Sequence, residues 1–354
     1  MNTTLKTSIE KLISHKLLTK EDFVALLNHN CIELRNELAY HANLQRKQHY
    51  GRKVYIRGLI EFTNYCKNDC FYCGIRCSNQ NAIRYRLSKE EILTCCEKGY
   101  ALGFRTFVLQ GGEDAYFDDF RMTEIIRSIR KQFPDCAITL SLGERTTESF
   151  KALLDAGANR YLLREETACE EHYQKLHPSH MSYQQRMQCL FTLKELGYQT
   201  GCGFMVGSPF QTPEMIANDL LFIQDFQPDM VGIGPFIHHD HTPFGNEPDG
   251  SIDDTLLLLS IVRLIKPDIL LPATTALSTL AANGREQGIL AGANVIMPNL
   301  SPDNVKPQYA LYQGKAYSGM EAAEQIALLK KQMTEIGYEI VTDIGNPSHI
   351  SSLS

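Results

Sequence analysis

The sequence predicts an α/β fold, a complete (β/α)8 TIM barrel with an N-terminal helical extension. Short apolar segments alternate with amphipathic ones from about Val54 to Ser301. Apolar runs of this kind are typical of parallel strands that are buried on both faces. Eight such runs separated by helices, over roughly 250 residues, match the barrel. A doubly wound open sheet is the alternative that the same pattern allows.

Residues 1–50 are predicted to form the helical extension. Apolar residues recur three or four positions apart in 9–17 and again in 23–27. Thr19 and Asp22 have the spacing of a capping box, with Asp in place of the usual Glu or Gln. This segment lacks the uninterrupted apolar stretch of a secretory signal.

The barrel is expected to occupy residues 51–301. Its predicted strands are 54–63, 105–110, 137–142, 160–164, 200–206, 229–236, 268–273 and 294–299. Its predicted helices are 88–102, 120–132, 147–156, 183–196, 213–225, 253–266 and 278–291. The runs "SKEE" and "TPEM" are typical helix starts. Gly103, Gly157 and Gly197 stand where helices should end.

Residues 302–354 are predicted to form a C-terminal tail. A helix is expected at 319–337, after which the periodic pattern is lost. We expect this tail, through its helix, to close the barrel.

Composition excludes some classes of function. The net charge of -6 and the isoelectric point near 6.0 indicate no broad cationic surface for nucleic acid. No apolar run approaches the roughly 18 residues that span a membrane. We therefore expect a cytoplasmic protein that binds neither nucleic acid nor membrane.

Eleven cysteines in such a protein indicate metal or redox chemistry rather than disulfides. Seven of them stand in helical or strand-like contexts and are expected to be small buried hydrophobes: Cys31, Cys95, Cys96, Cys136, Cys169, Cys189 and Cys202. The other four crowd into the run "YCKNDCFYCGIRC" at 65–77.

This run has the spacing C-x3-C-x2-C and then x3-C, and it directly follows the first predicted strand. In a barrel that position is the first loop of the catalytic face. Thiolates suit either zinc or an iron–sulfur cluster. Structural zinc usually requires two separated ligand pairs, and no second C-x2-C or histidine pair follows here. The pattern therefore favours an iron–sulfur cluster.

The three-cysteine spacing, with Tyr72 before the third cysteine, resembles the signature of the radical S-adenosylmethionine (SAM) superfamily. The resemblance implies that Cys66, Cys70 and Cys73 bind three irons of one 4Fe–4S cluster. The fourth iron would be left for the amino and carboxylate groups of SAM. Reductive cleavage of SAM would then generate a 5′-deoxyadenosyl radical. Cys77 lies outside the motif and is expected to be dispensable.

Other strand ends carry groups that suit SAM. The glycines of "LQGGED" allow close backbone approach, although an ordinary βα turn has the same pattern. A carboxylate in "LLREET" can accept ribose hydroxyls, and Arg186 can clamp a carboxylate or form a surface ion pair. The resemblance implies these cofactor-binding residues: Tyr72, Gly111, Gly112, Glu113, Asp114, Ser141, Glu166, Arg186 and Met205.

Within the superfamily the chain resembles the FeFe-hydrogenase maturases called HydE. The resemblance rests on "GLIEFTNYCKNDCFYCGIR", "VLQGGED", "TLSLGE", "RYLLREET", "GFMVGSPFQT", "DMVGIGPFI", "PATTA" and "GANVIMPN", and it covers about residues 20–340. It implies action in assembly of the di-iron subcluster (the H-cluster) on an iron–cysteine carbonyl/cyanide substrate. Partner maturases and a reductase, a ferredoxin or flavodoxin, are implied as well. The implied substrate contacts are Thr139, Arg164, Met230, Thr274, Thr275, Tyr309 and Tyr312.

The sequence departs from this group in two places. Some relatives carry three further cysteines for an accessory cluster, but residues 314–325 contain none, so a single cluster is expected. Glu165 stands where histidine is common. His238, His239 and His241 invite a second metal site, but they lack the spacing and the carboxylate that would support one.

Three alternatives stay open. A methylornithine synthase-like lysine mutase shares the cysteine spacing, "RYRL" and "GED". A biotin synthase-like enzyme would need cysteines for a second, sacrificial cluster, for which the cysteines at the strand ends look inadequate. The non-enzyme alternative is an iron–sulfur scaffold or electron carrier, which would bind a cluster without cleaving SAM.

Overall fold

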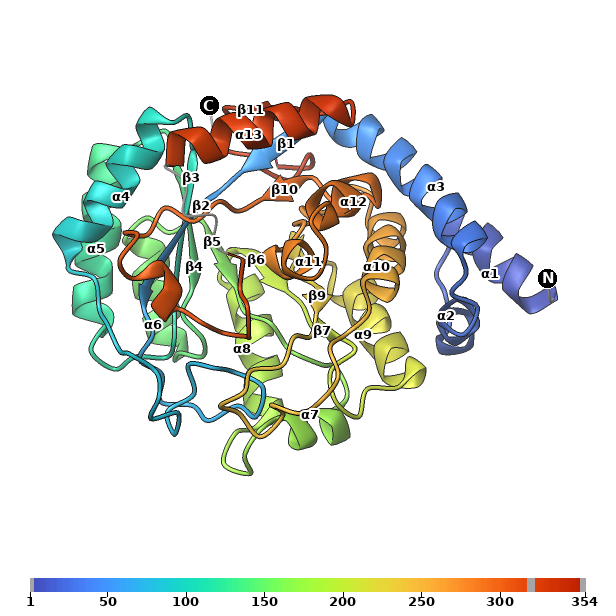
Figure 1. Cartoon of the computed structure of the whole chain (residues 1–354), viewed down its shortest axis with the longest axis horizontal. Coiled ribbons are helices and arrows are strands. Elements are labelled where there is room, and N and C mark those ends of the chain that lie inside the picture. Colours follow the sequence, from blue (N-terminus) through green and yellow to red (C-terminus); the bar gives the residue numbers. More distant parts are fainter. Residues whose placement is uncertain (1–2, 317–321, 351–354) are drawn as a thin grey trace.

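A parallel sheet of six strands forms the centre of the fold (Figure 1). The computed structural model describes residues 3–316 and 322–350. The sheet has the order β2-β3-β4-β5-β6-β8. Its strands are Gly58–Thr63 (β2), Thr106–Gly111 (β3), Ala137–Ser141 (β4), Arg160–Leu162 (β5), Gln199–Cys202 (β6) and Met230–Val231 (β8). The interiors of β2, β3 and β4 are buried on both faces, as predicted for this class of sheet.

Single bridges extend the parallel pairing beyond β8. Met230 pairs with Leu270, Pro272 pairs with Val295, and Leu59 of β2 pairs with Asn299. The segments expected as the last two strands are therefore adjacent to both edges of the sheet. Their regular pairing is short, because only Val295–Ile296 (β10) forms a named strand there.

Two smaller sheets accompany the central one. In the first, Lys53–Ile56 (β1) lies between β10 and Glu339–Val341 (β11), all parallel. In the second, Met205–Val206 (β7) pairs with Gly234–Pro235 (β9). The expected strand 54–63 is thus two strands, because the chain changes its pairing partners at Arg57.

Helices lie outside the strands in Figure 1. They are Lys89–Ala101 (α4), Asp119–Gln132 (α5), Thr147–Asp155 (α6), Glu170–Leu176 (α7), Tyr183–Glu195 (α8), Pro213–Phe226 (α9) and Ile252–Ile265 (α10). The predicted starts are confirmed: Ser88 closes a capping box with Glu91, and Thr212 caps α9 ahead of Pro213. The helix α7 was not expected from the sequence.

The expected helix 278–291 is interrupted. It consists of Thr275–Leu280 (α11) and Gly284–Leu290 (α12). At Gly284 a Cβ atom would lie 2.1 Å from the carbonyl oxygen of Leu277, so the chain folds back tightly there. Gly103, Gly157 and Gly197 follow helices with φ of 92°, 116° and 89°, as predicted for glycine stops.

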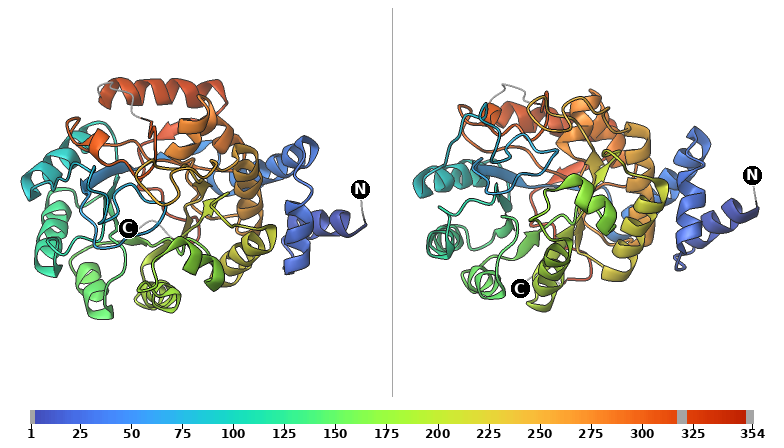
Figure 2. Two further views of the ribbon diagram at one scale, coloured as in Figure 1. Left: turned by 60° about the horizontal axis from the view of Figure 1, so that its bottom comes forward. Right: turned by 90° about the horizontal axis from the view of Figure 1, so that it is seen from below.

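The N-terminal helices are Thr3–Ile13 (α1), Lys20–Leu27 (α2) and Ile32–Tyr50 (α3). They lie on one side of the molecule in Figure 2, where α2 packs on α9 and α3 packs on α10. The predicted capping box of Thr19 and Asp22 is present. None of the described helices has the length and apolar character needed to cross a membrane.

The C-terminal segment returns to the strands. After the short turn Lys306–Gln308 (η1), the described chain resumes with Ala322–Glu335 (α13) and ends near β11. The first residues of the helix expected at 319–337 lie outside the described residues. The strand β11 was not expected, because its three residues are too few to show a pattern. Beyond it, Ile344 and Gly345 offer their carbonyls to the buried guanidinium of Arg160.

Candidate active site

The candidate site is a cavity of about 360 Å³ at the carboxyl ends of the central strands. Side chains from β2, β3, β4, β8 and the loops that follow them line it. Active sites of barrel enzymes occupy this end because the loops after the strands converge there. It contains all three motif cysteines and every residue expected to contact substrate: Thr139, Arg164, Met230, Thr274, Thr275, Tyr309 and Tyr312.

Cys66, Cys70 and Cys73 line the cavity, whereas Cys77 is exposed and does not. Burial raises the pKa of the Cys66 thiol, that of Cys73 to about 12, and that of Cys70 well above its usual value. The thiols therefore hold their protons until a metal displaces them, as thiolate ligation requires.

The loop that carries these cysteines is held from outside. The N–H of Lys67 donates to the carbonyl of Glu113 at 2.9 Å, and that of Cys77 donates to the carbonyl of Asn68 at 2.9 Å. Arg76 binds the carboxylate of Asp69 at 2.6 Å. Because backbone and surface groups fix the loop, the three thiols are free to face the interior.

The glycine pair after β3 packs directly on this loop. A Cβ atom on Gly112 would lie 2.2 Å from the carbonyl oxygen of Tyr65 and 2.7 Å from Cβ of Cys66. Only glycine allows this approach. Gly111 and Gly112 both line the cavity.

Arg186 lies 7% exposed in the cavity wall, which excludes the surface ion pair considered from the sequence. Its Nε donates to Glu144 at 2.6 Å, and a second nitrogen lies 4.0 Å from Glu113. Burial lowers the pKa of the guanidinium, but Glu144, Tyr173 and Glu113 outweigh it and raise that pKa overall. The result is a fixed cation beside the cysteine loop.

Glu166 adopts a left-handed backbone with φ of 66°, which is strained for a residue with a side chain. Its N–H donates to the carbonyl of Gly203 at 3.1 Å, and its carboxylate lies 3.2 Å from Arg164. The oxygen in that ion pair, Oε2, is buried and accepts no hydrogen bond. This oxygen can accept a ligand hydroxyl.

The cavity wall also carries unpartnered donors. Arg57 donates to the sulfur of Met230 at 2.9 Å, while its Nε and Nη2 are buried with no partner. Nε of Arg164 is also buried without a partner, whereas its Nη2 faces Glu166 at 3.2 Å, and the hydroxyls of Thr139 and Thr274 are unpartnered. Buried donors in this state suit an anionic ligand that would satisfy them.

The functional importance of Arg57 was not predicted from the sequence, although the sequence contains a signal for it. A charged residue inside the apolar run "VYIRGLIEFT" is costly unless it has a role. The same run contains Glu61, which is 1% exposed and also lines the cavity.

Two acidic residues of the motifs lie outside the cavity lining. Asp114, expected to contact the cofactor, accepts hydrogen bonds from Arg86 at 2.6 Å and Thr63 at 2.8 Å. Glu165 is fully buried and accepts from the N–H of Gly203 at 2.6 Å. Its role is therefore to support the backbone beside Glu166 rather than to contact a ligand.

The remaining expected cofactor contacts, Tyr72, Ser141 and Met205, line the cavity. The hydroxyl of Tyr72 lies 3.0 Å from Nε2 of His177. Burial lowers the pKa of His177 to about 3, so the ring stays neutral.

The histidines at 238–241 have other partners. His238 pairs with Asp249 at 2.8 Å, and His239 is buried and lines a separate, neighbouring cavity. Nowhere in residues 3–316 and 322–350 do three His, Cys, Asp or Glu side chains gather as ligands of a single ion. That result does not bear on an iron–sulfur cluster, in which the cysteines bind different irons.

Five of the seven other cysteines are buried, as expected. Cys31 and Cys169 are only partly buried, because each lies just before a helix start rather than within a core segment.

Residues 60–223 match the Radical SAM superfamily. Over 270 residues, which cover 76% of this chain and 77% of the relative, the chain is 46% identical to the [FeFe] hydrogenase maturase subunit HydE of Thermotoga maritima. The chain belongs to the radical SAM superfamily. It is therefore an enzyme of the type that uses a 4Fe–4S cluster and SAM.

Other radical SAM proteins are similar over much of their length. The 3-methylornithine synthase of Methanosarcina acetivorans is 31% identical over 83% of each chain. The crystal structure of methylornithine synthase (PylB) matches with a TM-score of 0.82 and 27% identity, over 94% of this chain and 97% of that one. The hydrogenase maturase HydG shares the fold, with a TM-score of 0.76 and 22% identity over 95% and 75%.

The residues present fit the radical SAM cofactors. Three cysteine thiols face one cavity, the fourth thiol of the run is turned to solvent, and Gly112 leaves room beside Cys66. An arginine and an unsatisfied carboxylate oxygen lie in the same wall. These are the groups that a cluster and an amino acid–nucleoside ligand require.

Proposed function

We propose that this radical SAM enzyme is a HydE-type hydrogenase maturase that acts in assembly of the di-iron subcluster. The observation that carries the proposal is a set of buried donors in the cavity wall. Arg57 has two nitrogens without partners, and the cavity is also lined by Arg164 and by the unpartnered hydroxyls of Thr139 and Thr274. Such a site suits an anionic iron complex, whereas the cavity carboxylates Glu61 and Glu166, which a lysine substrate would need for its ammonium groups, already pair with Lys315 and Arg164.

In this proposal Cys66, Cys70 and Cys73 hold the cluster through their thiolates. When bound, the cluster and SAM supply the 5′-deoxyadenosyl radical that abstracts hydrogen from substrate. Arg186 holds the SAM carboxylate, and Glu166 accepts hydrogen bonds from the ribose hydroxyls. Asp114 acts indirectly, because it fixes the side chains of Arg86 and Thr63 through hydrogen bonds. The other contacts are backbone or side-chain groups of Tyr72, Gly111, Gly112, Glu113, Ser141 and Met205.

In the same proposal the substrate is held in this cavity, beside the SAM site. Arg164, Thr139, Thr274 and Thr275 donate to its anionic ligands, while Met230, Tyr309 and Tyr312 enclose it. The buried side chains of Met230 and Tyr309 would exclude water from the substrate and so limit competing reactions there.

We further propose that the sheet closes into a complete eight-stranded barrel. The bridges of Met230 with Leu270, Pro272 with Val295, and Leu59 with Asn299 support closure. The accompanying division is an extension at 1–50, a barrel at 51–301 and a tail at 302–354. Contact of α3 with α10, and of β11 with β1, supports packing of both flanking segments on the barrel.

The implied partners are the other maturases, which would deliver the substrate, and a ferredoxin or flavodoxin reductase. Eleven cysteines suit a reducing, cytoplasmic location. The expected absence of an accessory cluster concerns residues 314–325, of which 317–321 lie outside the described residues.

The decisive experiment is anaerobic hydrogenase maturation in vitro with and without this protein, run beside a lysine-to-methylornithine assay. We expect hydrogenase activity to depend on the protein and no methylornithine to form. Production of methylornithine would favour the lysine mutase. That alternative has a relative, the 3-methylornithine synthase, to which this chain is 31% identical. Cluster binding without SAM cleavage would favour the scaffold or electron carrier.

A further inference from the structure

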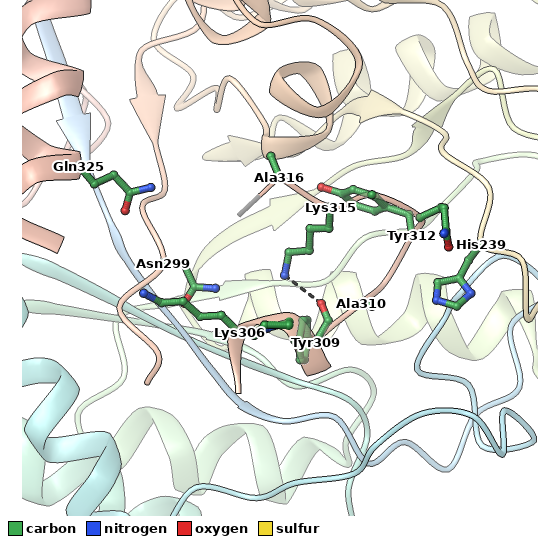
Figure 3. A pocket seen from close by; sticks show the side chains of 12 residues that line it. His239, Asn299, Lys306, Tyr309, Ala310, Tyr312, Lys315, Ala316 and Gln325 are labelled. Atoms are coloured by element: carbon green, nitrogen blue, oxygen red, sulfur yellow. Dashed lines mark hydrogen bonds between the residues drawn. The ribbon is translucent and has the colours of Figure 1, made fainter. Parts of the chain in front are cut away.

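A second cavity, of about 330 Å³, lies at the mouth of the barrel (Figure 3). We call it the outer pocket. Its lining includes His239, Asn299, Lys306, Tyr309, Tyr312 and Lys315. Tyr309, Tyr312 and Lys315 also line the barrel cavity, so the two spaces share a wall.

The outer pocket carries positive charge. Lys306 and Lys315 contribute ammonium groups, and none of the described lining residues is a carboxylate. Lys306 is 10% exposed at its side chain and pairs with Asp303 at 2.7 Å, outside the lining. The remaining polar groups are amides, phenols and an imidazole. A hollow of this composition favours an anionic, polar ligand.

Lys315 connects the outer pocket with the barrel interior. Its ammonium group forms an ion pair with Glu61 of β2 and donates to the carbonyl of Tyr309 at 3.0 Å, the bond drawn in Figure 3. Glu61 is 1% exposed and also accepts from Asn299 at 2.7 Å. The cation in contact with Glu61 is thus borne by the shared wall, and Lys306 adds a weaker attraction.

The backbone around Lys315 is fixed. The N–H of Gln313 donates to the carbonyl of His238 at 2.8 Å, and that of Ala316 donates to the hydroxyl of Thr279 at 3.1 Å. The carbonyl of Leu311 accepts from Gly74, beside the cysteine loop, at 2.8 Å. Opening the wall therefore requires motion of the lysine side chain, which is long and flexible, and not of the segment.

We propose that the outer pocket is the entry site for a carboxylate-bearing anionic substrate, and that Lys315 admits the substrate by exchanging Glu61 for its carboxylate. The assignment rests on the proposed function for the identity of the substrate. Glu61 draws Lys315 back once the substrate has passed, because a buried carboxylate without its cation is unfavourable. Lys315 is then a selectivity residue for entry, distinct from the arginines that hold the substrate inside.

The test measures association rates. The probe is a synthetic iron(II) complex with cysteine, carbonyl and cyanide ligands, and binding is followed by the shift of its carbonyl infrared bands. For wild-type protein the rate constant should fall as salt rises from 50 to 300 mM, roughly the range in which screening suppresses electrostatic steering. Lys315→Gln should associate about tenfold more slowly at low salt and lose most of this dependence.

Two further variants test the proposal even if Lys315→Gln folds poorly. Glu61→Gln/Lys315→Gln removes both charges, so that no buried carboxylate is left unpaired if the single variant folds poorly. It should show the same slow, salt-independent association. Ala316→Trp fills the outer pocket without touching the barrel cavity, whose lining excludes Ala316, and should slow both association and dissociation.

The matched control is Lys331→Gln on α13, whose side chain is 74% exposed. It should associate as the wild type does. Wild-type rates and salt dependence in the double variant and in Ala316→Trp would overturn the entry site. A wild-type protein that never binds the complex would instead overturn the proposed function, and the substrate assignment with it.

Discussion

Arg186 in the cavity wall donates a 2.6 Å hydrogen bond to Glu144, which lies outside the lining. The glutamate fixes one edge of the guanidinium, and the carbonyl of Arg164 accepts from another nitrogen at 2.9 Å. An arginine held in this way is preorganised for a carboxylate, because little side-chain freedom is lost when the ligand binds.

Replacing Arg186 by methionine should weaken SAM binding at least about tenfold and leave Glu144 without its cation, while Glu113 keeps Lys67 at 3.1 Å. We expect the unfolding free energy to fall by about 3 kcal/mol, the cost of breaking a buried ion pair from one side. Calorimetric titration with SAM and chemical denaturation measure the two effects. Iron content should stay at the wild-type level.

The control for this variant is Arg121→Met, which removes a pair with Asp118 whose side chains are both about half exposed. It should change stability by less than about 1 kcal/mol. Equal SAM affinity in both variants would contradict the role of Arg186.

Three cysteines of the run 65–77 should be required for the cluster, and the fourth should not. Alanine at Cys66, Cys70 or Cys73 should each abolish the cluster, because each thiol lines the cavity, whereas Cys77→Ser should keep it. Iron and sulfide analysis after anaerobic reconstitution should give about four irons per chain for the wild type and for Cys77→Ser. Loss of the cluster in Cys77→Ser would mean that the fourth coordination position is closed.

Glu165 should make stability depend on pH. Burial raises its pKa to about 7, partly offset by the hydrogen bond from Gly203. The folded state therefore binds a proton that the unfolded state has lost, so stability is full below about pH 4.5 and falls as pH rises through about 7. Glu165→Gln should flatten this fall, which is on the order of 3 kcal/mol.

Denaturation curves of wild type and Glu165→Gln at pH 5 and pH 8 measure this difference, and the other titrating groups cancel in the comparison. The variant should gain relative stability at pH 8. An identical pH dependence in the two proteins would show that Glu165 does not titrate there.

The C-terminal segment should stabilise the central sheet through Arg160 of β5. This buried guanidinium binds Thr106 at 3.0 Å, Gln199 at 2.7 Å and Asn346 at 2.7 Å. A chain ending at Val341 should lose roughly 3–5 kcal/mol, because it leaves a buried charge with too few partners. The same truncation in an Arg160→Met background should cost less, and thermal unfolding of the four proteins gives the coupling. Equal losses in both backgrounds would contradict the account.

Much of the fold could be predicted from local signals. Residues next to the helix ends show where helices begin and end. Ser88 and Thr212 mark helix starts, and Gly103 and Gly157 mark helix ends. The break at Arg57 and the strand β11 could not be predicted, because both depend on pairing between segments far apart in the chain. Sequence periodicity carries no information on such partners.

The site shows the same division. The cysteine loop and Arg186 follow from motifs, and the structure brings them to one cavity. Asp114 belongs to the same motif as Glu113, yet it turns to Arg86, since neighbouring residues on an extended segment point to opposite sides. The roles of Arg57, Glu61 and Lys315 emerge only when distant segments meet.

The central claim is that three thiols leave one iron of the cluster open to SAM. The most direct measurement is the electron paramagnetic resonance spectrum of the reduced, reconstituted protein before and after addition of SAM, followed by assay for 5′-deoxyadenosine. We predict that SAM changes the spectrum and that 5′-deoxyadenosine accumulates. A spectrum that SAM leaves unchanged, with no 5′-deoxyadenosine formed, would contradict the account.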